Sequence, residues 1–413
     1  MVRPPARAIA LAIALAVTGA PALARAQPAP QPPEQTFEGD PEAEEPIPPR
    51  PPPVQPELPP QDVQSFADAT LEATPLRFAF NVFGDVGVTG RSPAQGDERV
   101  DFALGAFALL INGQLSRSLL GTAEVKFDSD DQNHQTVTLE RLHLRWQTQR
   151  FYLVGGRTHT DIGYWNTAFH HGAWLHLPIA RPRVLRGDDS GGLLPIHWIG
   201  LEGGVIVPLA GTGALTVAGG VGNGRGGDEA EITIHRDRNN FKALKLKLEV
   251  LGLGWPDLRV GVAGLMDRIA PEPVDLRPAL PDMEIDEYIA NAYAAYRGAQ
   301  LTMIAEAYSI WHRSDLDTTS TTDAFVVLGY RVGRLTPYTL IERTDARSGV
   351  DPFYTPVPDM PTTSTPVDST ALSLGARIDP SVWSAVKLEV RLLRADHADD
   401  LDRSVAINWS FGI

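Results

Sequence analysis

The last nine residues of the chain, 405–413, alternate without a break between an apolar side chain and a small or polar one. Successive side chains of a β-strand point to opposite faces, so this segment predicts a strand with one apolar face. Trp409 and Phe411 fall on that face, whereas Asn408 and Ser410 fall on the other. The pattern fits the closing strand of a transmembrane β-barrel, and we expect this strand to pair with the first one near 78–82.

The same alternation returns along the chain from residue 76 onward, most clearly at 78–82, 244–250, 258–262 and 386–392. Together with weaker segments it predicts an all-β fold of about sixteen strands. The expected strands span 76–89, 100–115, 119–127, 136–147, 150–157, 195–209, 214–222, 241–251, 257–266, 285–296, 299–311, 323–332, 335–344, 368–378, 382–394 and 403–413.

Short and long connections follow one another in strict order between these segments. The links at 147–149, 210–213 and 297–298 are tight, whereas those at 157–194, 222–240 and 345–367 are long. Bacterial outer-membrane barrels join their antiparallel strands with short periplasmic turns and longer extracellular loops. Sandwiches and propellers have no reason to keep that order. The sequence therefore predicts an up-and-down transmembrane barrel over 76–413.

The first 75 residues divide into two further segments. Arg3 and Arg7, the apolar stretch 8–17 and the sequence Ala-Arg-Ala at 24–26 predict a secretory signal peptide over 1–26. Residues 27–75 hold fifteen of the 35 prolines and many acidic residues, which predicts a disordered, extended periplasmic linker. This arm either contacts the cell wall or partner proteins, or is a spacer without a specific partner.

Composition excludes several other classes of protein. The chain has no cysteine, so disulfides, thiolate metal sites and cysteine nucleophiles are absent. Its net charge of −15 argues against a nucleic-acid partner. No apolar run after the signal peptide is long enough for a membrane-spanning helix, so we expect insertion by a barrel alone.

The long connection 157–194 begins with a stretch rich in aromatic residues and histidine. A barrel of about sixteen strands otherwise leaves an open channel, so a natural role for this loop is to fold into the lumen and narrow it. The candidates for this constriction are Asp161, Tyr164, Trp165, Asn166, His170 and His171.

This loop, the segment 329–343 and the alternating C-terminal strand resemble the porin family that includes the phosphate-selective porins O and P. The resemblance implies a sixteen-stranded, trimeric, passive channel for small hydrophilic solutes or anions. Phosphate selectivity is not carried over, because acidic residues outnumber basic ones over 76–413. The chain also ends in Ile413, where such barrels usually end in Phe.

Charged residues recur at the positions opposite to the apolar face, where they would line the lumen. They either bias ion flux by their sign or are generic solvated residues without a role in selectivity. Those on the fourth and eighth strands would make a locally basic wall. The pore-lining candidates are Arg141, His143, Arg145, Arg157, Lys245, Lys247, Glu249, Glu306, Lys387, Glu389 and Arg391, with Asn408.

We expect no cofactor or metal ion. Adjacent residues on an extended chain point opposite ways, so His170 and His171 do not form a site by themselves. The acidic segment 128–131 lacks the glycine and terminal glutamate of an EF-hand loop. The glycine-rich segment 222–227 precedes a strand, whereas a dinucleotide site needs the start of a helix there.

The sequence thus favours a porin in the outer membrane of a Gram-negative bacterium. Its expected partners are outer-membrane lipid and lipopolysaccharide, the barrel-assembly machinery, small hydrophilic solutes, and two further copies in a homotrimer. The alternatives are a non-conducting scaffold barrel, a soluble periplasmic β-protein, and a barrel lipase or protease. The last would gather His159, His170, His171, Asp161, Asp188 and Ser190 from one loop, around which no nucleophile motif is recognisable.

Overall fold

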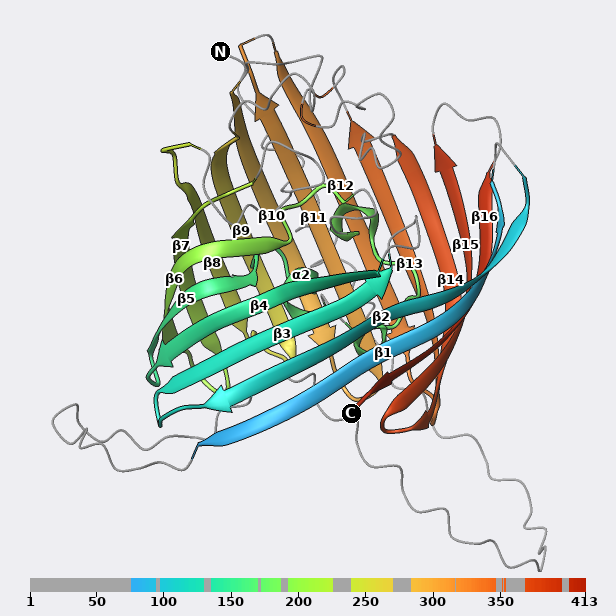
Figure 1. The fold of residues 1–413 in the computed structure, drawn as a ribbon, viewed down its shortest axis with the longest axis horizontal. Helices are drawn as coiled ribbons and strands as arrows, with labels where there is room; N and C mark the ends of the chain where they lie inside the picture. Colours follow the sequence, from blue (N-terminus) through green and yellow to red (C-terminus); the bar gives the residue numbers. More distant parts are fainter. Residues whose placement is uncertain are drawn as a thin grey trace, which may run out of the picture.

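Sixteen strands form one closed barrel in the computed structural model (Figure 1). Each strand pairs antiparallel with its neighbours in the sequence, and β1 pairs with β16 to close the ring. The structure describes residues 76–93, 97–129, 135–169, 172–186, 192–225, 239–269, 284–315, 317–346, 351, 353, 368–395 and 401–413. The predicted signal peptide and Pro-rich linker lie outside the described residues.

The observed strands match the expected ones in number and order, which confirms the predicted fold class. They are β1 (Arg77–Ser92), β2 (Arg99–Gln114), β3 (Leu119–Ser129), β4 (Gln135–Gln147), β5 (Phe151–His159), β6 (His197–Pro208), β7 (Ala214–Gly222), β8 (Ala243–Leu251), β9 (Leu258–Ile269), β10 (Ile285–Arg297), β11 (Leu301–Arg313), β12 (Thr318–Tyr330), β13 (Leu335–Ala346), β14 (Ser369–Ser381), β15 (Ser384–Ala395) and β16 (Asp402–Gly412).

The largest difference in strand boundaries is at β12, which begins at Thr318 although we expected its start at 323. The segment 318–322 consists only of Thr and Ser, so it lacks the alternation of apolar residues from which the other strands were predicted. Thr nevertheless favours extended structure, and this segment pairs with the end of β11 as far as Arg313.

The closing strand pairs with a later part of β1 than predicted. The β1–β16 ladder runs from Phe83 opposite Gly412 to Ser92 opposite Arg403. Only the final backbone hydrogen bonds, between Val82 and Ile413 at 2.8 and 2.9 Å, reach the expected segment. The expectation of pairing near 78–82 was wrong in register, because closing a barrel of tilted strands requires a stagger between the first strand and the last.

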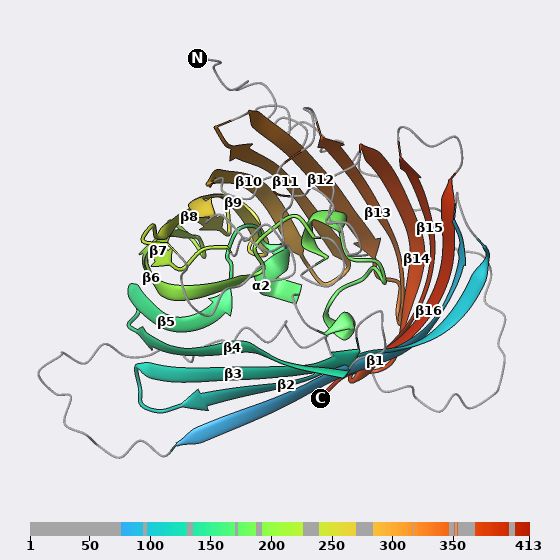
Figure 2. The ribbon, with the colours of Figure 1, turned by 45° about the horizontal axis from the view of Figure 1, so that its top comes forward.

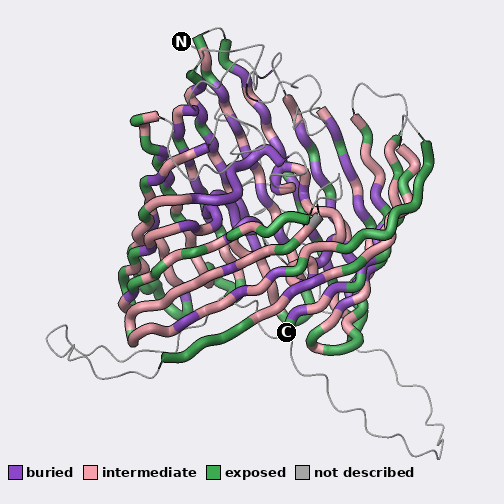
Figure 3. The backbone as a smooth tube through the Cα atoms, in the orientation of Figure 1, coloured by how far each residue is buried: buried purple, intermediate pink, exposed green. Residues whose placement is uncertain are grey.

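More exposed and more buried residues alternate along the strands (Figure 3), and many of the exposed ones are large and apolar. Leu246 is 57% exposed and Trp409 is 58% exposed, whereas Lys245 is 6% and Asn408 6% exposed. This alternation is the one that lipid on the outside and a polar lumen on the inside require. Among the described residues, no helix is both long and apolar enough to cross a membrane.

Candidate functional site

The connection between β5 and β6 folds back into the barrel instead of extending away from it (Figure 2). This inward loop, residues 160–196, contains the helix α2 (Trp165–Phe169) and the short 3-10 helices η2 (Ala173–Leu175) and η3 (Arg183–Leu185). Most of its described apolar residues are buried, with Trp165, Val184 and Leu185 each 0% exposed. The lumen therefore contains a packed hydrophobic core, which the loop forms together with inward-facing residues of the surrounding strands.

One face of the inward loop packs on apolar residues that the wall turns inward. The ring of Trp165 meets the ring of Phe325 on β12 edge to face, with centroids 5.7 Å apart. Tyr164 lies 6.2 Å from Tyr293 on β10, measured between ring centroids. Burying a large apolar side chain contributes about 1.5–3 kcal/mol, so these contacts hold the loop firmly against this side of the wall.

A carboxylate of the barrel wall accepts hydrogen bonds from the first backbone N–H groups of α2. Glu306 of β11 accepts hydrogen bonds from the backbone N–H groups of Tyr164 at 3.2 Å and Trp165 at 2.6 Å. The hydroxyl of Tyr308 donates a further hydrogen bond to the same carboxylate. The first N–H groups of a helix have no partner within the helix, and a negative charge there is favourable. Glu306 thus satisfies both requirements.

The middle of the inward loop is fastened to another part of the wall, on β14 and β15. Arg377 donates hydrogen bonds to the carbonyl oxygens of Trp174 at 2.5 Å and His176 at 3.2 Å. Lys387 donates to the carbonyl oxygen of Ala173. Here the wall supplies positive charge to backbone acceptors, which is the converse of the contact at Glu306.

Acidic residues of β13 and β15 hold the segment that follows. Glu389 accepts hydrogen bonds from the N–H groups of Ile179 at 2.8 Å and Ala180 at 3.1 Å. Glu342 accepts one from the N–H of Arg183 at 3.2 Å. Trp174 also packs with Phe83 of β1, next to the place where β1 and β16 close the barrel. The loop therefore contacts strands that are well separated around the wall. It crosses the lumen and is held on both sides.

The stems of the loop are joined to each other. Asn166 donates hydrogen bonds to the carbonyl oxygens of Thr160 at 2.7 Å and Ile196 at 3.1 Å, which lie at opposite ends of the loop. Asp161, in the first stem, forms an ion pair with Lys245 of β8 at 2.7 Å. Burial would raise the pKa of Asp161, but Lys245 and Lys247 hold that pKa below its usual value of 3.8.

His176 is the buried titratable group at the centre of the loop. Burial, with the nearby positive charges of Lys387 and Arg181, lowers the pKa of His176 well below its usual value of 6.5. Its Nδ1 lies 2.7 Å from the carbonyl oxygen of Pro178, where a neutral imidazole can donate a hydrogen bond. The imidazole therefore carries no charge in the folded protein at neutral pH.

The eleven predicted pore-lining residues are all buried or partly buried, and they form two groups. Glu306, Lys387, Glu389 and Arg391 lie beneath the inward loop, where the first three bind its backbone. The others lie on β4, β5 and β8, on the side from which the loop departs. These are Arg141, His143, Arg145, Arg157, Lys245, Lys247 and Glu249.

Three of the four cations for which β4 and β8 were expected to be basic have acidic partners. Arg141 pairs with Glu124 at 2.5 Å, and Lys245 lies 2.7 Å from Glu202 as well as from Asp161. Lys247 lies 3.7 Å from Glu249. Arg145 donates a hydrogen bond to the side chain of Gln147 at 2.7 Å, and Arg157 donates one to the carbonyl oxygen of Glu140 at 3.2 Å.

The constriction candidates Asp161, Tyr164, Trp165 and Asn166 all lie in the part of the loop that enters the lumen. His170 and His171 lie outside the described residues, as do Asp188 and Ser190 of the alternative enzyme site. Sequence reasoning missed Glu342 and Arg377. Both are buried charged residues that alternate with apolar residues along their strands, and this alternation could have revealed them. It also missed Glu140 and His197. Glu140 is out of step with the alternation of β4, because the register shifts at this point, and His197 stands among apolar residues.

Comparison with known proteins supports the architecture. No family model matches the chain, and no curated protein sequence matches it. Solved structures do match. An anion-selective porin from Comamonas acidovorans aligns with a TM-score of 0.56 at 11% identity, covering 82% of this chain and 100% of the porin.

Two further barrels align comparably well. The trimer form of OmpT, an outer-membrane protein of Vibrio cholerae, gives a TM-score of 0.55 at 12% identity, over 82% of this chain and 99% of OmpT. The outer-membrane channel DcaP of Acinetobacter baumannii gives 0.54 at 10% identity, over 82% and 97%. At such identities the likeness is one of fold alone, and it agrees with the closed sixteen-stranded barrel of this chain. The narrower resemblance to phosphate-selective porins remains a prediction.

Proposed function

We propose that the chain is an outer-membrane porin, a passive diffusion channel for small hydrophilic solutes or ions. The observation that carries the proposal is the inward loop, which crosses a closed sixteen-stranded barrel and is fastened to its wall by Glu306, Arg377, Lys387 and Glu389. A loop that crosses the lumen and is held at several points of the wall narrows the passage, which fits a channel that limits the size of its solutes. A loop that closed the lumen would make a plug instead, and a conductance measurement distinguishes the two.

We infer weak ion selectivity for this channel. Three of the four cations on β4 and β8 form ion pairs with acidic side chains, namely Arg141 with Glu124, Lys245 with Glu202 and Lys247 with Glu249. Opposite charges a few ångströms apart cancel most of each other's long-range field. The signal peptide at 1–26, the periplasmic arm at 27–75 and a homotrimer complete the proposal, and each of them rests on sequence patterns and on the resemblance to porins.

The decisive experiment is reconstitution of the purified, folded protein in a planar bilayer under a salt gradient. We expect discrete conductance steps and a reversal potential close to zero. Folded protein that migrates in a heat-modifiable way in detergent gels but never conducts would contradict the proposal. A large reversal potential of either sign would overturn the weak selectivity while leaving the channel intact.

The other function classes are distinguished in the same preparation. Hydrolysis of a lipid ester or peptide would favour the enzyme, whose candidates His170, His171, Asp188 and Ser190 lie outside the described residues. Deletion of residues 27–60 tests the arm. Unchanged conductance together with loss of cell-wall association would assign the arm to tethering rather than to the channel.

A further inference from the structure

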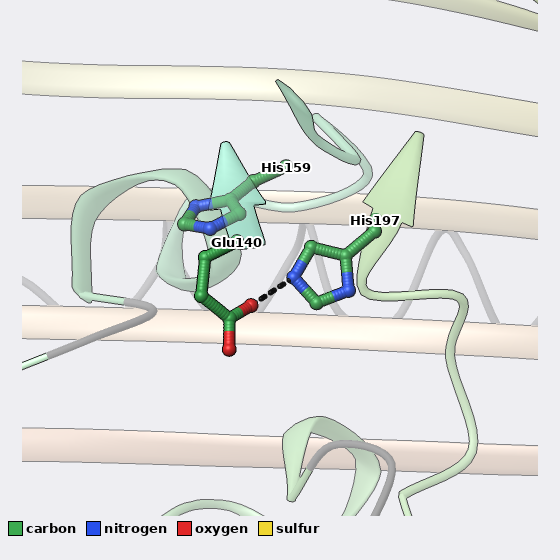
Figure 4. A group of neighbouring side chains, drawn as sticks. All are labelled: Glu140, His159 and His197. Atoms are coloured by element: carbon green, nitrogen blue, oxygen red, sulfur yellow. Dashed lines mark ion pairs between the residues drawn. The ribbon is translucent and has the colours of Figure 1, made fainter. Parts of the chain in front are cut away.

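Two histidines and a glutamate converge at the point where the inward loop leaves the wall (Figure 4). Glu140 lies on β4, His159 is the last residue of β5 and His197 is the first residue of β6. One potential ligand atom from each lies within 4.8 Å of the others. We propose that Glu140, His159 and His197 bind a divalent transition-metal ion such as Zn²⁺.

The backbone places these side chains together in a defined way. His159 and His197 are directly opposite each other in the β5–β6 ladder, and their ring centroids are 5.6 Å apart. The hydroxyl of Thr160 donates a hydrogen bond to the carbonyl oxygen of His197 at 2.9 Å, which ties the two loop stems just beyond the pair. Paired strands hold ligand side chains more accurately than a free loop does, so little ordering remains for a metal to impose.

The ligand types select the class of metal. Imidazole and carboxylate together suit Zn²⁺ and neighbouring transition metals, which take three protein ligands and leave a fourth position for water. Ca²⁺ and Mg²⁺ prefer six or more oxygen ligands, and this cluster offers a single carboxylate. All three residues are largely buried, with Glu140 1%, His197 4% and His159 7% exposed, so water competes little for the ligands.

In the structure, which contains no metal, two of the three ligand atoms lie closer together than they would around a bound ion. Nε2 of His197 lies 2.5 Å from a carboxylate oxygen of Glu140, which is the distance of a close ion pair. Bonds of about 2.0–2.1 Å at tetrahedral angles place two ligand atoms about 3.3 Å apart, so binding requires this pair to separate by less than an ångström. The alternative occupant of this position is therefore a proton shared between Glu140 and His197.

Neighbouring charges both support and oppose binding. A carboxylate oxygen of Glu124 lies 3.9 Å from Nε2 of His159, where a second carboxylate can orient a ligating imidazole. The amine of Lys126 lies 3.5 Å from Glu140 and competes with a cation for it. Lys126 has an alternative partner in Asp128 at 2.7 Å, so it can turn away without losing an ionic contact. The bound ion would clamp both stems of the loop to β4.

The test is a Zn²⁺ titration by calorimetry of the full-length folded barrel after treatment with a chelator. We expect one Zn²⁺ per chain, and a dissociation constant weakened roughly tenfold or more in each of H159A, H197A and E140Q. The matched control is H143A, which removes an inner-face histidine of β4 outside the cluster and should bind normally. K126Q, which removes the competing amine, should bind more tightly.

Two outcomes would overturn the site. One is the absence of stoichiometric binding in the unmodified protein, which assigns the cluster to a His–Glu ion pair alone. The other is unchanged binding in H159A/H197A, which places the ion elsewhere. Heat-modifiable migration checks that every variant is folded, and the isosteric E140Q keeps the test valid if a histidine variant fails to fold. As a second readout, Co²⁺ should give visible absorption bands that H197A lacks. None of these measurements depends on conductance.

Discussion

Oε1 of Glu306 lies 2.6 Å from the backbone nitrogen of Trp165, so an acidic residue of the barrel wall caps the helix that the inward loop brings into the lumen. The two residues are far apart in the sequence, and no local pattern links them. The contact fixes both the depth of α2 and its orientation against β11. It is therefore the first place to ask whether the loop sets the size of the channel.

Replacing Glu306 with Ala should loosen the loop and raise single-channel conductance and current noise. Each hydrogen bond to a charged acceptor contributes about 1.5–3 kcal/mol, and the variant removes at least two from the start of α2. The measurement is a comparison of current histograms in planar bilayers. E249Q is the matched control, because Glu249 bonds to the wall residues Tyr293 and Arg259. Equal conductance of E306A and the unmodified protein would show that α2 does not limit the channel.

The docking of the loop should weaken below about pH 6.5 because of His176. Its folded-state pKa lies well below 6.5, so at mildly acidic pH the released loop takes up a proton that the docked loop excludes. The contribution of neutral His176 to the stability of the docked loop is complete above the usual imidazole pKa of 6.5, and it declines as the pH falls below that value. We expect channel noise to increase from pH 7.5 to 5.5 in the unmodified protein and to change less in H176Q. H143Q, as a control, should retain the full pH response.

The fold could be predicted from the sequence because a lipid-facing wall imposes a local signal. Every second residue of each strand must be apolar, so a segment such as 244–250 reveals its own strand and its own outer face. Alternation says nothing about stagger, which depends on the tilt of all sixteen strands together. The register of β16 on β1 was for that reason the part of the fold that sequence reasoning placed wrongly.

The site was predictable only in part. The loop attracted attention through its aromatic residues, since a solvated loop has no use for Trp165 or Tyr164. Its anchors are wall residues whose partners are backbone groups, and a backbone N–H carries no sequence signature. The cluster of Glu140, His159 and His197 needs three strands in register, so spacing along the chain cannot disclose it.

The outer face should tolerate changes in apolar identity but not charge. Ile413, which is 63% exposed, should accept Phe without loss of assembly, because the parity of β16 is unchanged and its bonds to Val82 use the backbone. Leu246→Arg, in contrast, places a charge on the lipid face and should cost about 2–4 kcal/mol if it lies near the bilayer centre. Heat-modifiable migration and urea unfolding in lipid vesicles measure both. Poor assembly of I413F would show that the identity of the last residue matters.

Gly163 provides the sharpest test of how the loop is seated. Its φ of +90° favours glycine, and a Cβ there would lie 2.1 Å from the hydroxyl of Tyr308 and 2.3 Å from Glu306. Gly163→Ala should therefore displace the start of α2 as well as strain the backbone. Gly211, in the turn between β6 and β7, has a similar φ of +72° with nothing within 4 Å of a Cβ.

Gly211→Ala thus carries the backbone cost alone, about 1–2 kcal/mol, without touching the lumen. We expect G163A to unfold at lower urea concentration than G211A and to show raised, noisier conductance, while G211A conducts as the unmodified protein does. The difference between the two variants isolates the contact of the loop with Glu306 and Tyr308. If both variants conducted normally, the seat of α2 on β11 would have no part in setting the channel's width, and the constriction would have to lie at the Arg377 and Lys387 contacts instead.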